Sequence, residues 1–254
     1  LTNKHVTVYG QTEVTKDLYE IIQKENGTLI NNAEEVLPRE IDTENPYVTF
    51  KKNGVETKIK CDFIVGCDGY HGISRSTIPK NIISTHERVY PFGWLGILSE
   101  TSPVSDELIY ANHGNGFALA SMRNQNLSRY YIQTSLNDKI DDWPDKKFWD
   151  ELKKRLPTEA ADTIITGETI EKSIAPLRSF VCEPMSWKKL FLVGDAAHIV
   201  PPTGAKGLNL AVSDVYYLHR AFRQFYEFQI NDGLDIYSSK ALSRVWKAIR
   251  FSWW

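Results

Sequence analysis

The stretch that most constrains the fold is residues 190–209, LFLVGDAAHIVPPTGAKGLN. It begins with a four-residue apolar strand, Leu190–Val193, which runs into Gly194-Asp195. A loop rich in Pro and Gly follows, and a helix is predicted to begin near Gly207. In open α/β sheets, ligands bind beyond the carboxyl ends of the strands. The stretch therefore predicts an α/β fold with Asp195 at a ligand position.

The chemistry of this loop suits a polyhydroxylated, partly anionic cofactor. Loop glycines let the backbone approach a ligand closely, and a helix N-terminus offers free N–H groups with a partial positive charge. Asp195 would hold hydroxyl groups, and the helix end would face negative charge. The alternative is a plain strand–loop–helix connection in which the Asp is incidental.

Composition narrows the class of protein. A chain of 254 residues with 42% hydrophobic content can bury the core of one large or two modest domains. A net charge of −2 gives no reason to expect binding to nucleic acid or to an anionic membrane. No apolar run is long enough to span a bilayer, and no signal peptide opens the chain. Cys61, Cys67 and Cys182 have no metal-ligand spacing, which predicts reduced thiols in a cytosolic protein and no metal site.

The first 88 residues carry the marks of an α/β region. A strand pattern at Val6 and Val8 precedes an amphipathic helix over residues 14–22, which Gly27 is predicted to end. Two strands flank Asn53-Gly54, a strong hairpin signal. Phe63–Gly66 is a short buried strand that leads into a second Asp-Gly pair.

From residue 89 the sequence becomes rich in strands. The predicted strands are Trp94–Leu98, Glu107–Tyr110, Phe117–Met122 and Arg129–Gln133, and a helix is predicted over Asp145–Leu156, closed by Pro157. This shift predicts that an antiparallel β-sheet substrate domain, residues 89–174, is inserted between the two parts of the cofactor domain, residues 1–88 and 175–230. Two long helices follow, and residues 231–254 begin a C-terminal helical region.

The two ends of the sequence lead us to expect an internal part of a longer enzyme. The chain begins with Leu, and helical spacing from Leu242 to Trp253 continues without a Gly or Pro stop. No strand–Gly-x-Gly-x-x-Gly–helix unit supplies the usual pyrophosphate cradle. The alternative is that this polypeptide, by itself, is not an enzyme.

The stretch around Asp195 resembles the second flavin-binding motif of the FAD-dependent aromatic hydroxylases (group A flavoprotein monooxygenases). The resemblance rests on Gly194-Asp-Ala-Ala-His198, on the Pro pair that ends at Pro202 and on the glycine-rich helix start. The resemblance runs from Val6 to Trp254. It is strongest to the members of the family that hydroxylate 4-hydroxybenzoate. Ala205 and Lys206, where Gly and Gln are frequent, agree with those members. The resemblance implies an incomplete Rossmann-like FAD-binding domain with the inserted sheet and C-terminal helices.

A second motif, Asp68-Gly69 to Arg75, again follows a buried strand. It resembles the fingerprint that serves both FAD and the nicotinamide donor in this family, although Gly72 stands where Ser is usual. His71 and Arg75 could meet a pyrophosphate or a 2′-phosphate. Taken alone, the motif is equally well explained by an Asp-Gly turn beside a surface Arg.

The predicted sheet offers a receptor for a small carboxylate. Ser121 and Arg123 are two residues apart on one strand, and Arg129 and Tyr131 repeat the arrangement on the next, so each pair should share a face. Spacing alone favours a solvated outer face of an antiparallel sheet. The resemblance implies instead that Ser121, Arg123 and Tyr131 bind the substrate carboxylate and that Arg129 helps to position the flavin.

The resemblance implies roles for several further residues. Tyr110, otherwise a packed strand aromatic, would hydrogen-bond the phenol of the substrate and start a proton relay, and Pro202 would offer a carbonyl nearby. A hydrogen bond to the ionised phenol lowers the pKa of that phenol. The ring of a phenolate is richer in electrons than the ring of a phenol. Implied contacts to the cofactors comprise Gln11, Asp68, Asp195, Gly204, Gly207, Leu208 and Asn209 for FAD, and Arg178 for NADPH.

The implied reaction is hydroxylation of 4-hydroxybenzoate to 3,4-dihydroxybenzoate with NADPH and O2 through a flavin hydroperoxide. The protein would place the cofactor and supply the electrostatics. A homodimer is implied for the parent enzyme. The nearest alternative is a related hydroxylase that acts on another aromatic acid.

Overall fold

The computed structural model describes residue 7 and residues 9–252. The chain divides into two compact units, which we call unit 1 (residues 1–29 and 90–177) and unit 2 (residues 30–89 and 178–254). This division groups residues 1–29 with residues 90–177, and the domain limits predicted from the sequence stay a prediction. The strand predicted at Val6 and Val8 lies outside the described residues, as does Trp253.

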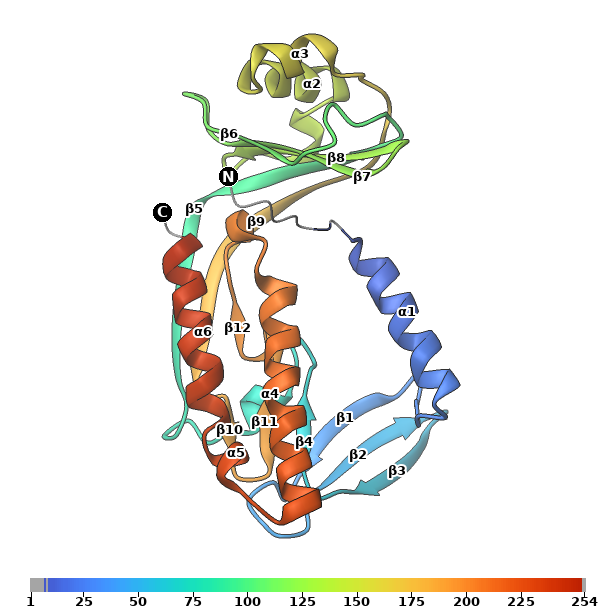
Figure 1. Cartoon of the computed structure of the whole chain (residues 1–254), viewed down its shortest axis with the longest axis vertical. Helices are drawn as coiled ribbons and strands as arrows, with labels where there is room; N and C mark the ends of the chain where they lie inside the picture. The colour runs from blue at the N-terminus through green and yellow to red at the C-terminus, as the bar shows by residue number, and fades with distance from the viewer. Residues whose placement is uncertain (1–6, 8, 253–254) are drawn as a thin grey trace. The chain divides into compact units, whose positions relative to one another are not determined.

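Unit 1 contains an antiparallel sheet in the order β9-β5-β8-β7-β6, to which β5 contributes from residue 90 on and β9 up to residue 177. The full strands are β5 (Ser84–Ser99), β6 (Ile109–Ala111), β7 (Ala118–Asn124), β8 (Leu127–Thr134) and β9 (Thr169–Glu183), and the unit also contains α1 (Gln11–Lys24), η2 (Ile140–Asp142), α2 (Asp145–Arg155) and α3 (Thr158–Thr163). Figure 1 shows α2 and α3 over one face of this sheet. The predicted antiparallel sheet is therefore confirmed.

Strict alternation along β8 gives the sheet two different faces. Tyr130 and Ile132 are fully buried in a core shared with Phe148 and Leu152 of α2, while alternate residues of β8 are half-buried on the opposite face. Two predicted limits were wrong. β6 begins at Ile109 rather than Glu107, and β5 begins at Ser84, well before the predicted start at Trp94.

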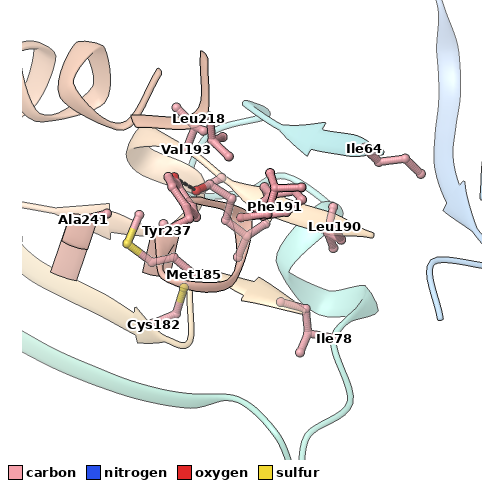
Figure 2. Close-up of a cluster of buried hydrophobic side chains, with 14 of the residues drawn as sticks. Ile64, Ile78, Cys182, Met185, Leu190, Phe191, Val193, Leu218, Tyr237 and Ala241 are labelled. Atoms are coloured by element: carbon pink, nitrogen blue, oxygen red, sulfur yellow. Dashed lines mark hydrogen bonds between the residues drawn. The ribbon is translucent and has the colours of Figure 1, made fainter. Parts of the chain in front are cut away.

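In unit 2, a small sheet pairs β4 (Ile64–Gly66) in parallel with β11 (Leu190–Leu192), and β10 (Ser186–Trp187) lies antiparallel to β11. The helices are α4 (Gly207–Phe228), α5 (Asp232–Asp235) and α6 (Tyr237–Ser252), with η1 (Ser74–Thr77), η3 (Gly194–Ala196), β12 (His198–Ile199) and η4 (Pro202–Gly204) between strands and helices. Figure 2 shows Met185, Phe191 and Tyr237 gathered in the core of this unit. The predicted buried strands and C-terminal helices are confirmed.

The Asn53-Gly54 hairpin forms as predicted, and a third strand extends it. β1 (Glu34–Arg39), β2 (Tyr47–Lys52) and β3 (Val55–Lys60) make an antiparallel sheet. Both turn residues are left-handed, with φ of 51° and 77°, which matches the twist of the flanking strands. β1 was not predicted. Among the described residues, no helix is both long enough and apolar enough to cross a bilayer.

Candidate functional site

Asp195 lies on the η3 turn between β11 and β12. Every other residue from Leu190 to His198 is buried, and Asp195 alone in this run is exposed. Gly194 adopts φ +60°, and a Cβ at this position would lie 3.1 Å from the Cβ of Ala211 on α4. The sequence therefore presents a single carboxylate from a turn that is pressed against a helix.

Two side chains hold the η3 turn from either side. The carboxylate of Asp214 on α4 accepts a hydrogen bond from the Gly194 N–H at 3.1 Å. The guanidinium of Arg75 donates to the carbonyl of Ala196 at 2.7 Å. Because the two contacts flank Asp195, the backbone that carries Asp195 is held by residues distant in sequence.

The start of α4 is open to a ligand. Lys206 is the N-cap and forms no side-chain capping bond. The first intrahelical bond joins the Leu210 N–H to the Lys206 carbonyl at 2.9 Å, so the helix itself does not use the amides before Leu210. A Cβ at Gly207 would meet no atom within 4 Å. Exposed Asp195 and this uncapped helix end fit a ligand with hydroxyls and negative charge.

The neighbouring loop residues have roles in local structure. Ala205 is left-handed, with φ 46°, which explains why Gly is frequent there in the resembled family. The Asn209 amide donates to the Ala205 carbonyl at 3.3 Å, and Leu208 is exposed. The Pro202 carbonyl accepts the Ala205 N–H at 2.8 Å. A Cβ at Gly204 would lie 3.1 Å from Ser252 Oγ, so this residue packs closely against α6.

Asp68 turns into its own loop. Its carboxylate accepts the Ser74 N–H at 2.8 Å at the start of η1. A Cβ at Gly72 would lie 2.1 Å from Asp68 Cγ. The departure from the usual Ser at position 72 therefore has a physical reason, because any side chain there would displace Asp68.

Three of the predicted cofactor-binding side chains gather around the ring of Tyr70. The guanidinium carbons of Arg75 and Arg178 lie 5.1 Å and 4.9 Å from the ring centroid, and the exposed His71 ring makes an edge contact at 4.9 Å. Arg178 also pairs with Glu87 at 3.2 Å. Arg75 uses two nitrogens on the carbonyls of Ala196 and Tyr70, a structural role that sequence reasoning missed.

Three of the predicted substrate residues, Tyr110, Ser121 and Tyr131, lie on the sheet face opposite the core. Tyr110, Leu119, Tyr131 and Gly96 form one row across four strands, each opposite the next. Ser121 lies opposite Arg129 in the adjacent row. Along this face Leu119 and Ser121 are buried, Arg129 and Tyr131 are half-buried, and Tyr110 and Arg123 are exposed.

Aromatic rings cover this face beside the polar groups. Trp94 stacks on Phe117 with centroids 4.6 Å apart, and Phe117 lies 5.7 Å from Tyr110. Trp94 also contacts Tyr131 at 5.5 Å. A Cβ at Gly96 would lie 2.5 Å from the Tyr131 ring, so only glycine leaves room for that ring. Sequence reasoning missed these aromatic neighbours, although their strand parity would have placed them on this face.

The face carries more positive than negative charge. Arg129 Nε donates to the Tyr131 hydroxyl at 3.1 Å, and Nη2 pairs with Glu171 at 2.9 Å. Arg129 Nη1 is buried and has no hydrogen-bond partner within the described residues. The hydrogen bond from Arg129 lowers the pKa of Glu171, and the charge of Arg123 adds to this effect. A further anion would therefore find an unused donor here.

Three further predicted residues are Arg123, Tyr110 and Gln11. A register shift between Met122 and Asn124 leaves Arg123 exposed and outside the regular ladder. Burial raises the pKa of Tyr110, which is still 45% exposed. Gln11 is the exposed first residue of α1. Within residues 7 and 9–252, no group of three His, Cys, Asp or Glu side chains could hold a metal ion.

Comparisons with known proteins found several similar ones. The p-hydroxybenzoate hydroxylase of Acinetobacter baylyi is 56% identical over 251 residues, which are 99% of this chain and 62% of that relative. A kynurenine 3-monooxygenase of Aspergillus candidus is 27% identical over 74% of this chain and 40% of its own length. The structure of p-nitrophenol 4-monooxygenase from Pseudomonas putida superposes with a TM-score of 0.79 at 15% identity, covering 96% of this chain and 63% of that one. The chain thus spans less than two thirds of these relatives.

One protein family accounts for nearly the whole sequence. The profile described as "FAD binding domain" matches residues 1–252. This range includes the Asp195 turn, the start of α4 and every other candidate residue described above. The extent of the match shows that the chain belongs to the FAD-binding domain family.

Proposed function

We propose that the chain is part of a flavin-dependent monooxygenase that hydroxylates 4-hydroxybenzoate to 3,4-dihydroxybenzoate with NADPH and O2. The observation that carries the proposal is the aromatic-lined face of unit 1. Tyr110 lies two strands away from Tyr131, which corresponds to about 10 Å between strand axes. A para-substituted benzene ring fits this span, with its phenol toward Tyr110 and its carboxylate toward Tyr131. The 56% identity to a p-hydroxybenzoate hydroxylase supports the same substrate.

The carboxylate of the substrate would meet Ser121, Arg123 and Tyr131. The Ser121 hydroxyl forms only a long bond of 3.4 Å to the Met122 carbonyl, so it is available to a ligand. A guanidinium binds a carboxylate through charge-assisted bonds, which are about twice as strong as neutral ones. Arg129, already joined to Tyr131, keeps the phenol of that tyrosine oriented.

At the other end of the ring, Tyr110 would hydrogen-bond the phenol oxygen of the substrate. Donation to the ionised form lowers the pKa of that phenol and favours the phenolate. A phenolate directs electron density to the adjacent ring carbon, which is the carbon to be hydroxylated. The Pro202 carbonyl has one lone pair engaged by the Ala205 N–H, and the other would accept from the substrate phenol only while that phenol still carries its proton.

FAD is the cofactor of the family, and we propose that Asp195 holds its hydroxyl groups. The open amides at Gly207, Leu208 and Asn209 would face its negative charge, and Asp68, Gly204 and Gln11 are assigned supporting contacts. Bound FAD supplies the redox chemistry by accepting electrons from NADPH and delivering oxygen from O2. His71 and Arg178 would meet the phosphates of NADPH, helped by the charge of Arg75.

The substitution Tyr110→Phe tests the substrate assignment. Without the hydroxyl, the phenolate is no longer stabilised, so NADPH oxidation should continue while hydroxylated product falls. The ratio of 3,4-dihydroxybenzoate formed to NADPH oxidised measures this coupling. Tyr226→Phe is the matched control, because its hydroxyl bonds to Asp62 and lies outside the proposed site.

Unchanged coupling in Tyr110→Phe would reject the assignment. Better coupling with another aromatic acid than with 4-hydroxybenzoate would support a related hydroxylase instead.

We also propose a cytosolic homodimer. Free cysteines at positions 61, 67 and 182 fit a reducing compartment, and light scattering measures the oligomeric state.

A further inference from the structure

A buried carboxylate interrupts the apolar stripe of α4. The buried residues of this helix are Leu210, Asp214, Leu218 and Ala221, which recur at helical spacing. Asp214 is only 1% exposed, yet it occupies a position at which an apolar side chain would be expected. Burial of a carboxylate is costly unless it is paired and hydrogen-bonded. Its contacts should therefore reveal why the helix carries it.

Both contacts of Asp214 fall on the segment that contains Asp195. One carboxylate oxygen accepts the Gly194 N–H at 3.1 Å and lies 2.7 Å from His198 Nε2. His198 is also buried, on β12, where it pairs with Val181 of β9. One oxygen atom therefore joins the two ends of the five-residue segment that surrounds Asp195.

The backbone conformation at Gly194 holds the attached turn close to α4. Its positive φ and its close approach to Ala211 place the turn directly against α4, one helical turn before Asp214. The Arg75 contact at Ala196 restrains the other side of the turn. With both sides held, the backbone that carries the exposed Asp195 is restrained.

We propose that Asp214 is a positioning residue for the cofactor site. Its carboxylate fixes the η3 turn through Gly194 and His198, so that Asp195 is presented toward the hydroxyl groups of FAD. This inference rests on the proposed role of Asp195. Asp214 itself is buried beneath the turn and acts only through it.

A double-mutant cycle on FAD affinity tests the proposal. The four proteins are the wild type, Asp195→Ala, Asp214→Asn and the double variant, each prepared as the whole protein to which this chain belongs, and the dissociation constant is measured by flavin fluorescence. Asp214→Asn keeps the size of the side chain and removes its charge. We expect it to weaken FAD binding about tenfold in the wild type, the scale of one hydrogen bond to a charged group, and to have no further effect once Asp195 is Ala.

A merely structural role predicts a different pattern. The loss caused by Asp214→Asn would then be the same in both backgrounds, and that result would overturn the proposal. Normal FAD affinity in Asp214→Asn, with weakened affinity in Asp195→Ala, would also overturn it while leaving the function of Asp195 intact. Normal affinity in Asp195→Ala would reject the cofactor assignment itself, and this inference with it.

Two further variants guard against misfolding. Asp235→Asn changes an exposed Asp on α5 and should bind FAD as the wild type does. If Asp214→Asn does not fold, the same cycle is run with His198→Gln, which leaves the Gly194 hydrogen bond and removes the imidazole. A smaller loss that also disappears in the Asp195→Ala background supports the proposal, and an additive loss contradicts it. The melting temperature of each FAD-free protein reports whether it is folded.

Discussion

The sheet face of unit 1 and the η3 turn of unit 2 place their functional groups by different means. On the sheet, Tyr110, Leu119 and Tyr131 share a face because regular register puts each opposite the next. At the turn, Asp195 is oriented by Asp214 and Arg75, whose contacts join residues 20 and 121 positions apart. The face is thus a product of local periodicity, and the turn is a product of long-range contacts.

This difference predicts how each region responds to substitution. Deleting a side chain from the sheet face should remove its own contact with the ligand and leave the fold intact. A change beneath the turn should alter a site that the changed residue does not touch. The following predictions test this distinction.

The largest effect is expected from Arg123→Ala. Arg123 is exposed and outside the strand ladder, so its loss should not disturb the sheet. Losing a charge-assisted bond to the substrate carboxylate should weaken 4-hydroxybenzoate binding up to about a hundredfold. Titration of the FAD-loaded protein measures the dissociation constant. Lys153→Ala on α2 is the control, and equal affinities in the two variants would reject the carboxylate site.

Gly96→Ala should be the exception on the sheet face. The added Cβ would lie 2.5 Å from the Tyr131 ring, so the ring must move and stability should fall by about 1–3 kcal/mol. Gly114→Ala in the same unit meets no atom within 4 Å and should be neutral. Urea unfolding compares the two. If both variants are as stable as the wild type, the row of residues across the sheet does not depend on the space above Gly96.

Gly194→Ala adds only a methyl group, yet it should impair the turn. A left-handed non-glycine residue costs about 1–3 kcal/mol, and the Cβ also presses on Ala211, so FAD binding should weaken about tenfold. Gly54→Ala, at φ +77° in the β2–β3 hairpin, carries similar strain away from the cofactor residues. It should lose stability and keep FAD affinity. A loss of FAD affinity in both variants would mean that general strain explains the effect.

Glu171→Gln should produce the smallest effect, in the opposite direction. Removing the carboxylate that pairs with Arg129 should strengthen 4-hydroxybenzoate binding by about threefold, in line with the low energy of exposed ion pairs. Arg129 lowers the pKa of Glu171, so the pair is intact above the ordinary glutamate pKa of about 4.3 and is lost as pH falls through the lowered value. The gain should therefore be constant near neutral pH. A gain that varied between pH 6 and 8 would contradict this assignment.

Regular elements were predictable from the sequence because their signals are local. The alternation of β8, the Asn53-Gly54 turn and the start of α4 at Gly207 were all confirmed within a few residues. The limits of β5 and β6 were wrong, and β1 was missed, because pairing with neighbouring strands decides where a strand starts. The residue pattern of β1, with Pro38 inside it, gave no alternation to detect.

The candidate site was predictable only in part. The Asp-containing motifs pointed to candidate ligand-binding residues, yet not to the contacts that hold those residues. Arg75 was expected to meet phosphate, and the structure gives it two backbone carbonyls as partners. Asp214 carried a usable signal, a carboxylate within an apolar helical stripe, but its partners His198 and Gly194 emerge only from the packing of α4 on the turn.

The most direct test of the account is product formation by the FAD-loaded whole protein with 4-hydroxybenzoate. NADPH oxidation and 3,4-dihydroxybenzoate formation are followed together in air-saturated buffer. We predict that 4-hydroxybenzoate accelerates NADPH oxidation and that product accounts for nearly all the NADPH consumed. NADPH oxidation that is indifferent to 4-hydroxybenzoate, or that yields no hydroxylated product, would contradict the assignment of the sheet face as its receptor.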